Sequence, residues 1–394
     1  MISFRQKATL REIEDSYALV NNSSDGVLRV PADLRYGGSY AVPASLIQFI
    51  AVWARSISDS TLRLYPSGTS AAPGENLAQE PHGIAALYFA GQVSDPVDDV
   101  SKKSALAYAI PRIEAMQAGR YRDTMHGRGA FLGCFAGAKN EYLRPFYARG
   151  DAESLRTRDE FITLIGQIVA ACAPSSERHL NTSRLVAIGS LLYELFKNTH
   201  EHASTDEQGV RYRKNLRGVL AKFISVPIEG ENPDILSGED PSYAFFMLRY
   251  LANKKRHVTA EGRLRAGTQL SFLELTVIDT GPGLIRRWLS RFPKPPNLDG
   301  LTIEDEVSII KKCFEMHATT KDSKSSGGGL DRVVQTLSEL KGFLRLRTGR
   351  VCLVQDFSST KANAFAPRHW DPERTELPHT VGAAYSIVIP LSLT

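Results

Sequence analysis

The chain has 394 residues, a formal net charge of +5 and 42% apolar residues. That length predicts two domains, and the apolar fraction is ample for two cores. No apolar run approaches the length that crosses a bilayer, and the N-terminus lacks the basic and then apolar pattern of a signal peptide. We therefore expect a cytoplasmic protein without a membrane segment. The cysteines form no CxxC pair, which indicates neither a zinc site nor a disulfide framework; they are Cys134, Cys172, Cys313 and Cys352.

The first part of the chain, residues 1–155, has the pattern of a smaller α/β domain with a regulatory or interaction role. Strand patterns at 26–32 and 61–65 enclose a helical pattern at 44–56, which predicts a β-α-β start. The glycine-rich run at 127–133 lacks the Lys-Ser/Thr pair that completes a phosphate-binding loop. That run therefore predicts a tight turn.

The most informative helix of the sequence covers residues 182–203. Its apolar residues recur at helical spacing and form one face: Leu185, Ile188, Leu192, Leu195 and Phe196. Glu194, Asn198 and His202 recur at every fourth residue, so their side chains form one stripe along the helix. A carboxylate can orient or deprotonate a water, and an amide oxygen one turn away can hold a hard cation such as Mg²⁺. The alternative is an ordinary amphipathic helix with a solvated polar edge.

A second motif follows a buried strand. Residues 271–278 alternate and are rich in β-branched and apolar residues, which predicts a strand that ends at Asp279. A carboxylate at a strand end can accept a hydrogen bond from an exocyclic amine. Gly281 and Gly283 would let the backbone approach a flat ring without interference from a Cβ atom. Strands that end in an Asp-Gly turn are common, so this motif is weak by itself.

A third motif is the glycine run 327–329, which opens a helix that begins near Leu330. Free N–H groups at such a helix start, together with the helix dipole, form a cradle suited to phosphates. Just upstream, Thr319, Thr320 and Lys321 add hydroxyls and an ammonium group that could reach the same phosphates. The alternative is a flexible Ser/Gly linker.

The order of these three motifs resembles that of the GHKL, or Bergerat-fold, ATPase superfamily, which includes type II topoisomerases, heat-shock ATPase chaperones, sensor histidine kinases, MutL and MORC proteins. Residues 194–203 are similar to its N box, 279–283 to its first glycine box and 327–330 to its second. The segment 317–321 (HATTK) resembles the lid-flanking segment of MutL proteins, and 382–391 resembles the last strand of kinase-type ATPase domains.

The resemblance covers roughly residues 158–394 and implies an α+β fold. It predicts a C-terminal Bergerat-fold sandwich at 156–394, with helices on one face of a mixed sheet, after the smaller domain at 1–155. It implies that Glu194 and Lys321 are catalytic and that Asn198, with Glu194, holds Mg²⁺. The nucleotide-binding set that it implies is Asn198, Glu201, His202, Asp279, Thr280, Gly281, Gly283, Thr319, Thr320, Gly327, Gly328, Gly329 and Leu330.

The sequence departs from the family pattern at three places. Glu201 stands where chaperone-like members often have an aspartate. Ala383 stands where many members place a threonine that supports the adenine-binding aspartate, so we expect adenine recognition to depend more on Asp279 and Thr280. The glycine run is shorter than the full GxGxG pattern that accompanies lid closure in the family.

The function implied is that of a Mg²⁺-dependent ATP hydrolase that acts as a nucleotide-gated switch for a homodimer or a partner protein. Glu194 favours hydrolysis, since it can serve as a general base. The alternatives are a protein kinase that phosphorylates serine or histidine, and a nucleotide-dependent binding module without turnover. Basic clusters at 211–217 and 254–265 could contact nucleic acid, but solvated faces are favoured.

The segment 284–326 predicts a mobile ATP lid, because Pro and Gly residues leave hinges near both of its ends. Its alternative is a helix and loop packed permanently on the domain, since 303–314 is strongly helical. The aromatic, helix-like segment 245–251 predicts an inserted element that packs on the domain or on a partner.

Overall fold

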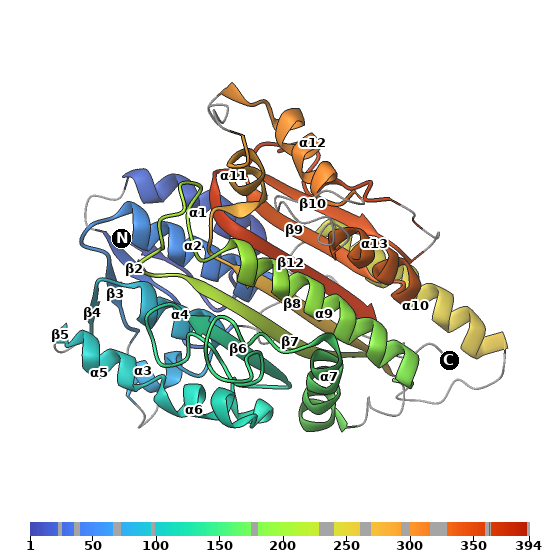
Figure 1. Ribbon diagram of the computed structural model, residues 1–394, viewed down its shortest axis with the longest axis horizontal. Coiled ribbons are helices and arrows are strands. Elements are labelled where there is room, and N and C mark those ends of the chain that lie inside the picture. Colours follow the sequence, from blue (N-terminus) through green and yellow to red (C-terminus); the bar gives the residue numbers. More distant parts are fainter. Residues whose placement is uncertain are drawn as a thin grey trace.

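The computed structural model describes residues 1–22, 26–34, 40–65, 72–95, 99–174, 180–227, 240–260, 269–292, 300–315, 329–358, 362 and 364–391. The protein contains a smaller, mostly parallel sheet and a larger antiparallel sheet, both combined with helices (Figure 1). This confirms a fold that mixes helices and strands. No helix among the described residues is long and apolar enough to cross a membrane.

The smaller sheet has the order β1-β2-β3-β4-β5. Strands β1 to β4 run parallel, and β5 is antiparallel to β4. Helix α2 connects β2 to β3, which confirms the predicted β-α-β start. The strands of this sheet are β1 (Ile2–Ser3), β2 (Val27–Arg29), β3 (Thr61–Arg63), β4 (Gln92–Ser94) and β5 (Asp99–Val100). The helices of this part are α1 (Leu10–Asn22), α2 (Val42–Ser56), α3 (Pro73–Leu77), α4 (Pro81–Phe89), α5 (Lys102–Ala107) and α6 (Ile110–Ala118), followed by the 3₁₀ turn η2 (Tyr121–Asp123).

The larger sheet has the order β11-β10-β9-β12-β8-β7-β6. Every pairing in it is antiparallel among the described residues, whereas we predicted a mixed sheet. The reason is that β9 and β10 form a tight hairpin at Gly349, and β12 then enters between β8 and β9, antiparallel to both. Its strands are β6 (Gly129–Phe135), β7 (Leu216–Pro227), β8 (Gln269–Asp279), β9 (Phe343–Gly349), β10 (Val351–Asp356), β11 (Arg368–His369) and β12 (Thr380–Pro390).

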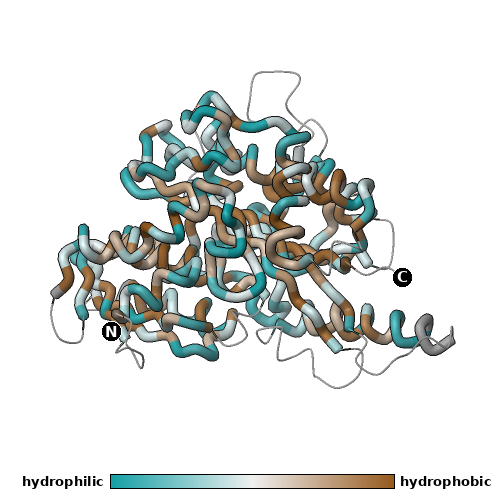
Figure 2. The backbone as a smooth tube through the Cα atoms, turned by 90° about the horizontal axis from the view of Figure 1, so that it is seen from below, coloured by the Kyte–Doolittle hydropathy of each residue, from teal (hydrophilic) through white to brown (hydrophobic). Residues whose placement is uncertain are grey.

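Strand β6 corrects one prediction, and its pairing with β7 joins the two sides of the expected domain boundary. We predicted a tight turn at 127–133, but Gly127, with φ 85°, forms the turn and the chain then continues as β6. Although β6 lies within 1–155, it pairs with β7 at the edge of the larger sheet. The buried apolar residues of both sheets form one continuous core. Figure 2 shows hydrophobic segments concentrated in the interior and hydrophilic ones toward the periphery.

Helices cover both faces of the larger sheet, whereas we predicted helices on one face. On the first face, α9 (Thr182–His202) lies over the strands and runs in nearly the same direction as they do, packed against α7 (Arg158–Cys172) and α13 (Gly329–Leu340) (Figure 1). On the second face lie α2 and α10 (Pro241–Ala260), which includes the predicted aromatic insert. All seven residues of β9 are buried, and successive side chains of a strand point to opposite faces. Both faces of such a strand need a cover.

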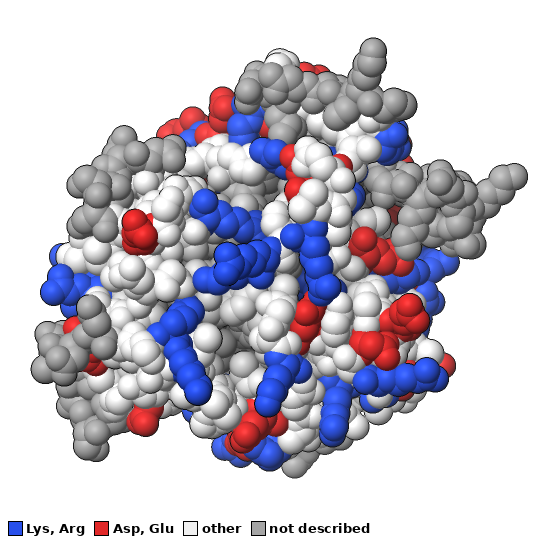
Figure 3. Space-filling view, turned by 60° about the vertical axis from the view of Figure 1, so that its left-hand side comes forward, with Lys and Arg blue, Asp and Glu red and all other residues white. Residues whose placement is uncertain are grey.

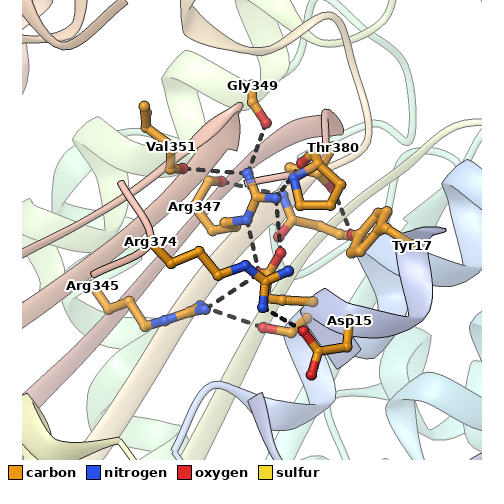
Figure 4. A network of polar contacts seen from close by, with 12 residues as sticks. Asp15, Tyr17, Arg345, Arg347, Gly349, Val351, Arg374 and Thr380 are labelled. Atoms are coloured by element: carbon orange, nitrogen blue, oxygen red, sulfur yellow. Dashed lines mark hydrogen bonds and ion pairs between the residues drawn. The ribbon is translucent and has the colours of Figure 1, made fainter. Parts of the chain in front are cut away.

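A buried ionic network joins α1 to β9 (Figure 4). The Arg347 guanidinium donates to both carboxylate oxygens of Glu14 at 2.9 Å, and also to the carbonyls of Gly349, Val351 and Pro378. Arg345 lies 3.8 Å from the same carboxylate. The three charged side chains are at most 2% exposed. Glu14 is therefore the anion that compensates two buried cations beneath the sheet.

We expect Glu14→Gln to lower the free energy of unfolding by about 3 to 5 kcal/mol, because it leaves two buried guanidinium groups without their carboxylate. Urea denaturation followed by circular dichroism measures the change. The matched control is Asp15→Asn, since Asp15 pairs with Arg374 at the surface and is 60% exposed. That variant should lose less than about 1 kcal/mol. Equal losses in the two variants would show that the buried network is not a major source of stability.

Candidate functional site

Helix α9 is formed where the sequence predicted it and carries the first motif. It begins after Asn181, whose side chain accepts a hydrogen bond from the Arg184 N–H, and it ends at His202. Its apolar face is buried against the larger sheet. On its polar stripe, Glu194 is buried and Asn198 is half-buried. A buried carboxylate requires partners, because an unpaired charge is costly away from water.

The partners of Glu194 are two arginines. Its Oε1 accepts hydrogen bonds from Arg158 Nη2 at 2.5 Å and from Arg332 Nη1 at 3.1 Å. Arg158 is the first residue of α7, and Arg332 lies in the first turn of α13. These residues are 36 and 138 positions away from Glu194, so no local pattern in the sequence indicated the contacts.

The third motif approaches the first at the start of α13. A Cβ atom on Gly329 would lie 3.1 Å from Glu194 Oε2 and 3.9 Å from Asn198 Oδ1. The start of α13 is therefore next to a carboxylate oxygen and an amide oxygen of α9. Leu330 is buried within α13. The other predicted residues of this region lie outside the described residues: Thr319, Thr320, Lys321, Gly327 and Gly328.

The second motif packs against the C-terminal end of α9. Strand β8 ends at Asp279 as predicted, and a Cβ atom on Gly281 would lie 2.6 Å from Ala203 Cα. The Asp279 Oδ1 accepts the Gly281 N–H at 2.8 Å. Burial raises the pKa of Asp279 to about 6, against the opposing effect of hydrogen bonds from the Gly281 and Ala383 N–H groups.

Protein contacts already engage the other residues of this turn. The Thr280 hydroxyl accepts the Leu216 N–H at 2.9 Å, which ties the turn to β7 and buries the side chain completely. Gly283 has φ 79°, and a Cβ atom there would meet Thr348 Oγ1 at 2.8 Å. These contacts give Thr280, Gly281 and Gly283 a structural reason for being present, independent of any ligand.

Thr348 on β9 is a residue of this region that sequence reasoning missed. Its hydroxyl donates to the Gly382 carbonyl at 2.8 Å and accepts the Leu284 N–H at 3.3 Å. Ala383 occupies the position where the family pattern has threonine, so we expected adenine recognition to depend more on Asp279 and Thr280. The strand order brings Thr348 beside the turn instead. A cavity of about 180 Å³ adjoins it, lined by Pro282, Ile285, Arg286, Glu306, Thr348, Gly349, Arg350 and His379.

The last two predicted residues of α9 make contacts near the helix end. Glu201 lies 3.9 Å from the Lys197 ammonium group. The carbonyl of His202 accepts a hydrogen bond from Arg287 at 2.8 Å, and the same guanidinium donates to the carbonyl of Thr205. Arg287 thereby gives the carbonyl of His202, the last residue of α9, a hydrogen-bond partner that the helix itself does not supply.

The described part of the predicted lid is packed on the domain. Arg287 belongs to α11 (Gly283–Leu289), and α12 (Ile303–Cys313) follows with a reciprocal cap between Thr302 and Asp305. Glu306 binds Arg350 at 2.6 Å, and Phe314 stacks on Phe365 with ring centroids 3.9 Å apart. These contacts agree with the alternative of a packed helix for 300–315. Residues 293–299 and 316–328 lie outside the described residues.

The basic cluster at 211–217 is partly engaged within the protein. Arg211 forms an ion pair with Glu141, and Arg217 donates to the Glu141 carbonyl at 3.2 Å. Figure 3 shows one face of the molecule, on which Lys and Arg side chains surround a shallow hollow. The two arginines thus have protein partners, and their presence alone does not indicate nucleic-acid binding.

A scan against protein-family models found no match to this chain, and searches of curated proteins and of solved structures found none either. The similarity to GHKL ATPases thus depends on the motifs quoted above. The geometry adds that the three motifs, where described, all lie along α9.

The raised pKa of Asp279 predicts a pH-dependent stability. Between pH 4 and 6 the folded protein holds a proton on Asp279 that the unfolded chain has released, so the free energy of unfolding should fall as pH rises through this window. Relative to Asp279→Asn, we expect a fall on the order of 2 kcal/mol, measured by urea denaturation at several pH values.

Asp305 provides a control, because its contribution to stability should change with pH in the opposite direction. Hydrogen bonds from the Thr302 N–H and hydroxyl lower its pKa, so its contribution to stability should be lost as pH falls. A difference between the parent and Asp279→Asn that does not change with pH would mean that burial does not perturb Asp279.

Proposed function

We propose that the protein is a Mg²⁺-dependent ATPase of the GHKL type that acts as a nucleotide-gated switch. The observation that supports this most is the convergence of three distant motifs on one helix. Gly329 lies against Glu194 and Asn198, and Gly281 lies against Ala203 at the end of the same helix. An ATP molecule along α9 would have its adenine near Asp279 and its phosphates near the start of α13.

The residue chemistry fits the parts of this ligand. The Asp279 carboxylate would accept a hydrogen bond from the adenine amine. Asn198 Oδ1 and Glu194 Oε2 are hard oxygen donors on one side of the helix, which suits Mg²⁺ shared between the protein and the phosphates. The metal ion would neutralise phosphate charge. We also include in the proposed phosphate site five residues that lie outside the described part of the chain, because the sequence motifs contain them: Lys321, Thr319, Thr320, Gly327 and Gly328.

In the proposed reaction, Glu194 takes a proton from a water molecule whose oxygen attacks the γ-phosphorus. A bond forms between that oxygen and phosphorus, and the bond from phosphorus to the β–γ bridging oxygen breaks. The products are ADP and inorganic phosphate. Binding and release of the γ-phosphate would then alter a surface used by a second copy of the chain or by a partner protein.

Transfer of the phosphate to a protein side chain is the competing reaction. Among the histidines, His82 is completely buried, and its Nε2 lies 2.9 Å from the Pro31 carbonyl. Burial also lowers the pKa of His82 to about 4. His200 hydrogen-bonds Tyr147. Neither of these two side chains stands free as a phosphate acceptor. Binding without turnover is distinguished by the second experiment below.

We expect Asp279→Asn to weaken ATP and ADP binding about tenfold or more, because it removes a charge-assisted hydrogen bond worth about 1.5 to 3 kcal/mol. Isothermal titration calorimetry on the folded variant measures this. Asp305→Asn, which removes a surface carboxylate in α12, should leave the affinity unchanged. Unaltered affinity in Asp279→Asn would contradict the adenine assignment.

We expect the protein incubated with γ-labelled ATP and Mg²⁺ to release the label as free phosphate, with none retained on the chain. Glu194→Ala should slow this release by about 10²- to 10⁴-fold, and Asn198→Ala should lose Mg²⁺-dependent binding. Glu339→Ala, on the exposed side of α13, is the matched control. Label retained on protein would indicate a kinase, and binding without any release would indicate a binding module.

A further inference from the structure

We propose that Arg158 and Arg332 bind the terminal phosphate of ATP, and that without nucleotide the same two guanidinium groups hold the Glu194 carboxylate. The inference rests on the proposed function, because it names the γ-phosphate ligands and the regulation of that same site. In this arrangement the general base becomes available only when a γ-phosphate has replaced it as the partner of the arginines.

The burial of the three groups is unequal. The Glu194 side chain is 8% exposed, whereas those of Arg158 and Arg332 are 42% and 59% exposed. The carboxylate is thus fixed inside the protein, and the two cations reach it from the solvent side. Long, partly solvated arginine side chains can change rotamer at low cost, whereas a buried carboxylate on a packed helix cannot move far. An incoming anion would therefore move the arginines.

The local charge favours such an anion. One carboxylate faces two guanidinium groups, which leaves an excess of one positive charge among these three residues. The Arg158 Nε is buried and has no hydrogen-bond partner within the part of the chain that the structure describes. Both arginines lie in the first turn of a helix, where the helix dipole adds positive potential. A phosphate offers three oxygens to planar guanidinium forks, which bind it bidentately.

The two arginines also limit the ability of Glu194 to act as a base. Both arginines donate to Oε1, so this oxygen already accepts two hydrogen bonds and is poorly placed to take a proton from water. ADP lacks the γ-phosphate and would leave these contacts intact. ATP would draw the guanidinium groups to its terminal phosphate and release Oε1. The ion triplet would then act as a sensor that couples catalytic competence to the presence of the γ-phosphate.

A purely structural role is the competing explanation. In that case the triplet only joins α7, α9 and α13, which pack side by side. Glu194→Gln distinguishes the structural role from the phosphate-sensing role, because the amide keeps the shape of the side chain but binds the arginines less strongly. A structural lock predicts weaker folding and no gain in binding. A competing anion predicts tighter binding of nucleotides that carry a γ-phosphate.

The test is calorimetry of the full chain with Mg²⁺ and either ADP or a non-hydrolysable ATP analogue. We expect Arg332→Ala and Arg158→Ala to bind the analogue about tenfold more weakly, with ADP affinity changed by less than about twofold. Glu194→Gln should raise the affinity for the analogue several-fold relative to the affinity for ADP, since any loss of a Mg²⁺ ligand affects both nucleotides alike. Combining Glu194→Gln with Arg332→Ala should abolish the gain. Arg249→Ala, which breaks the ion pair with Asp356 on the opposite face, should change neither affinity.

The outcomes separate the two proposals. If the parent binds neither nucleotide, the proposed function is wrong. If the parent binds both but the variants shift ADP and the analogue equally, the inference is overturned and the proposed function stands. Arg332→Lys keeps the positive charge but lacks the forked guanidinium group. Its affinity for the analogue should lie between those of the parent and Arg332→Ala, so the proposal can be tested even if an alanine variant folds poorly.

Discussion

The larger sheet must be covered on both faces, and most of the architecture follows from this. Its central strands have no solvent-exposed face, since β9 and the greater part of β8 and β12 are buried along their length. One cover consists of α7, α9 and α13, and the other recruits α2 and α10. The N-terminal part of the chain therefore shares a core with the C-terminal part, and the polar groups trapped between them require internal partners such as Glu14 for Arg347.

This arrangement places the N-terminal helices next to the candidate site. Arg347 and Thr348 are neighbours on β9 and point to opposite faces. Arg347 binds Glu14 of α1, while Thr348 contacts the Gly382 carbonyl beside the turn that follows Asp279. Gln48 of α2 donates to the carbonyls of Arg347 and Val381, on the strands that support this turn. The contacts of α1 and α2 with the sheet thus lie one residue from the groups that shape the proposed adenine site.

The proposed phosphate end of the site depends on a different kind of interaction. At the turn after β8, hydrogen bonds between backbone and side chains fix the positions, and glycines allow close packing. At Glu194, three charged side chains from three helices determine the geometry. Charged groups that are partly exposed can exchange partners with an incoming anion, whereas closely packed backbone cannot. A rigid base-recognition end and a rearrangeable phosphate end are what a nucleotide-gated switch would need.

The sequence determined the local elements and the residue types within them. Periodicity located α9, β8 and α12, and the spacing of Glu194, Asn198 and Asp279 indicated these side chains as candidate site residues. Only the tertiary structure decided that helices cover both faces of the sheet, that β6 joins it, that Thr348 lies at the turn and that two arginines hold Glu194. Periodicity and motif spacing report on neighbours along the chain. These contacts instead join residues far apart in sequence. The position of β12 between β8 and β9 in the sheet determines where such residues meet.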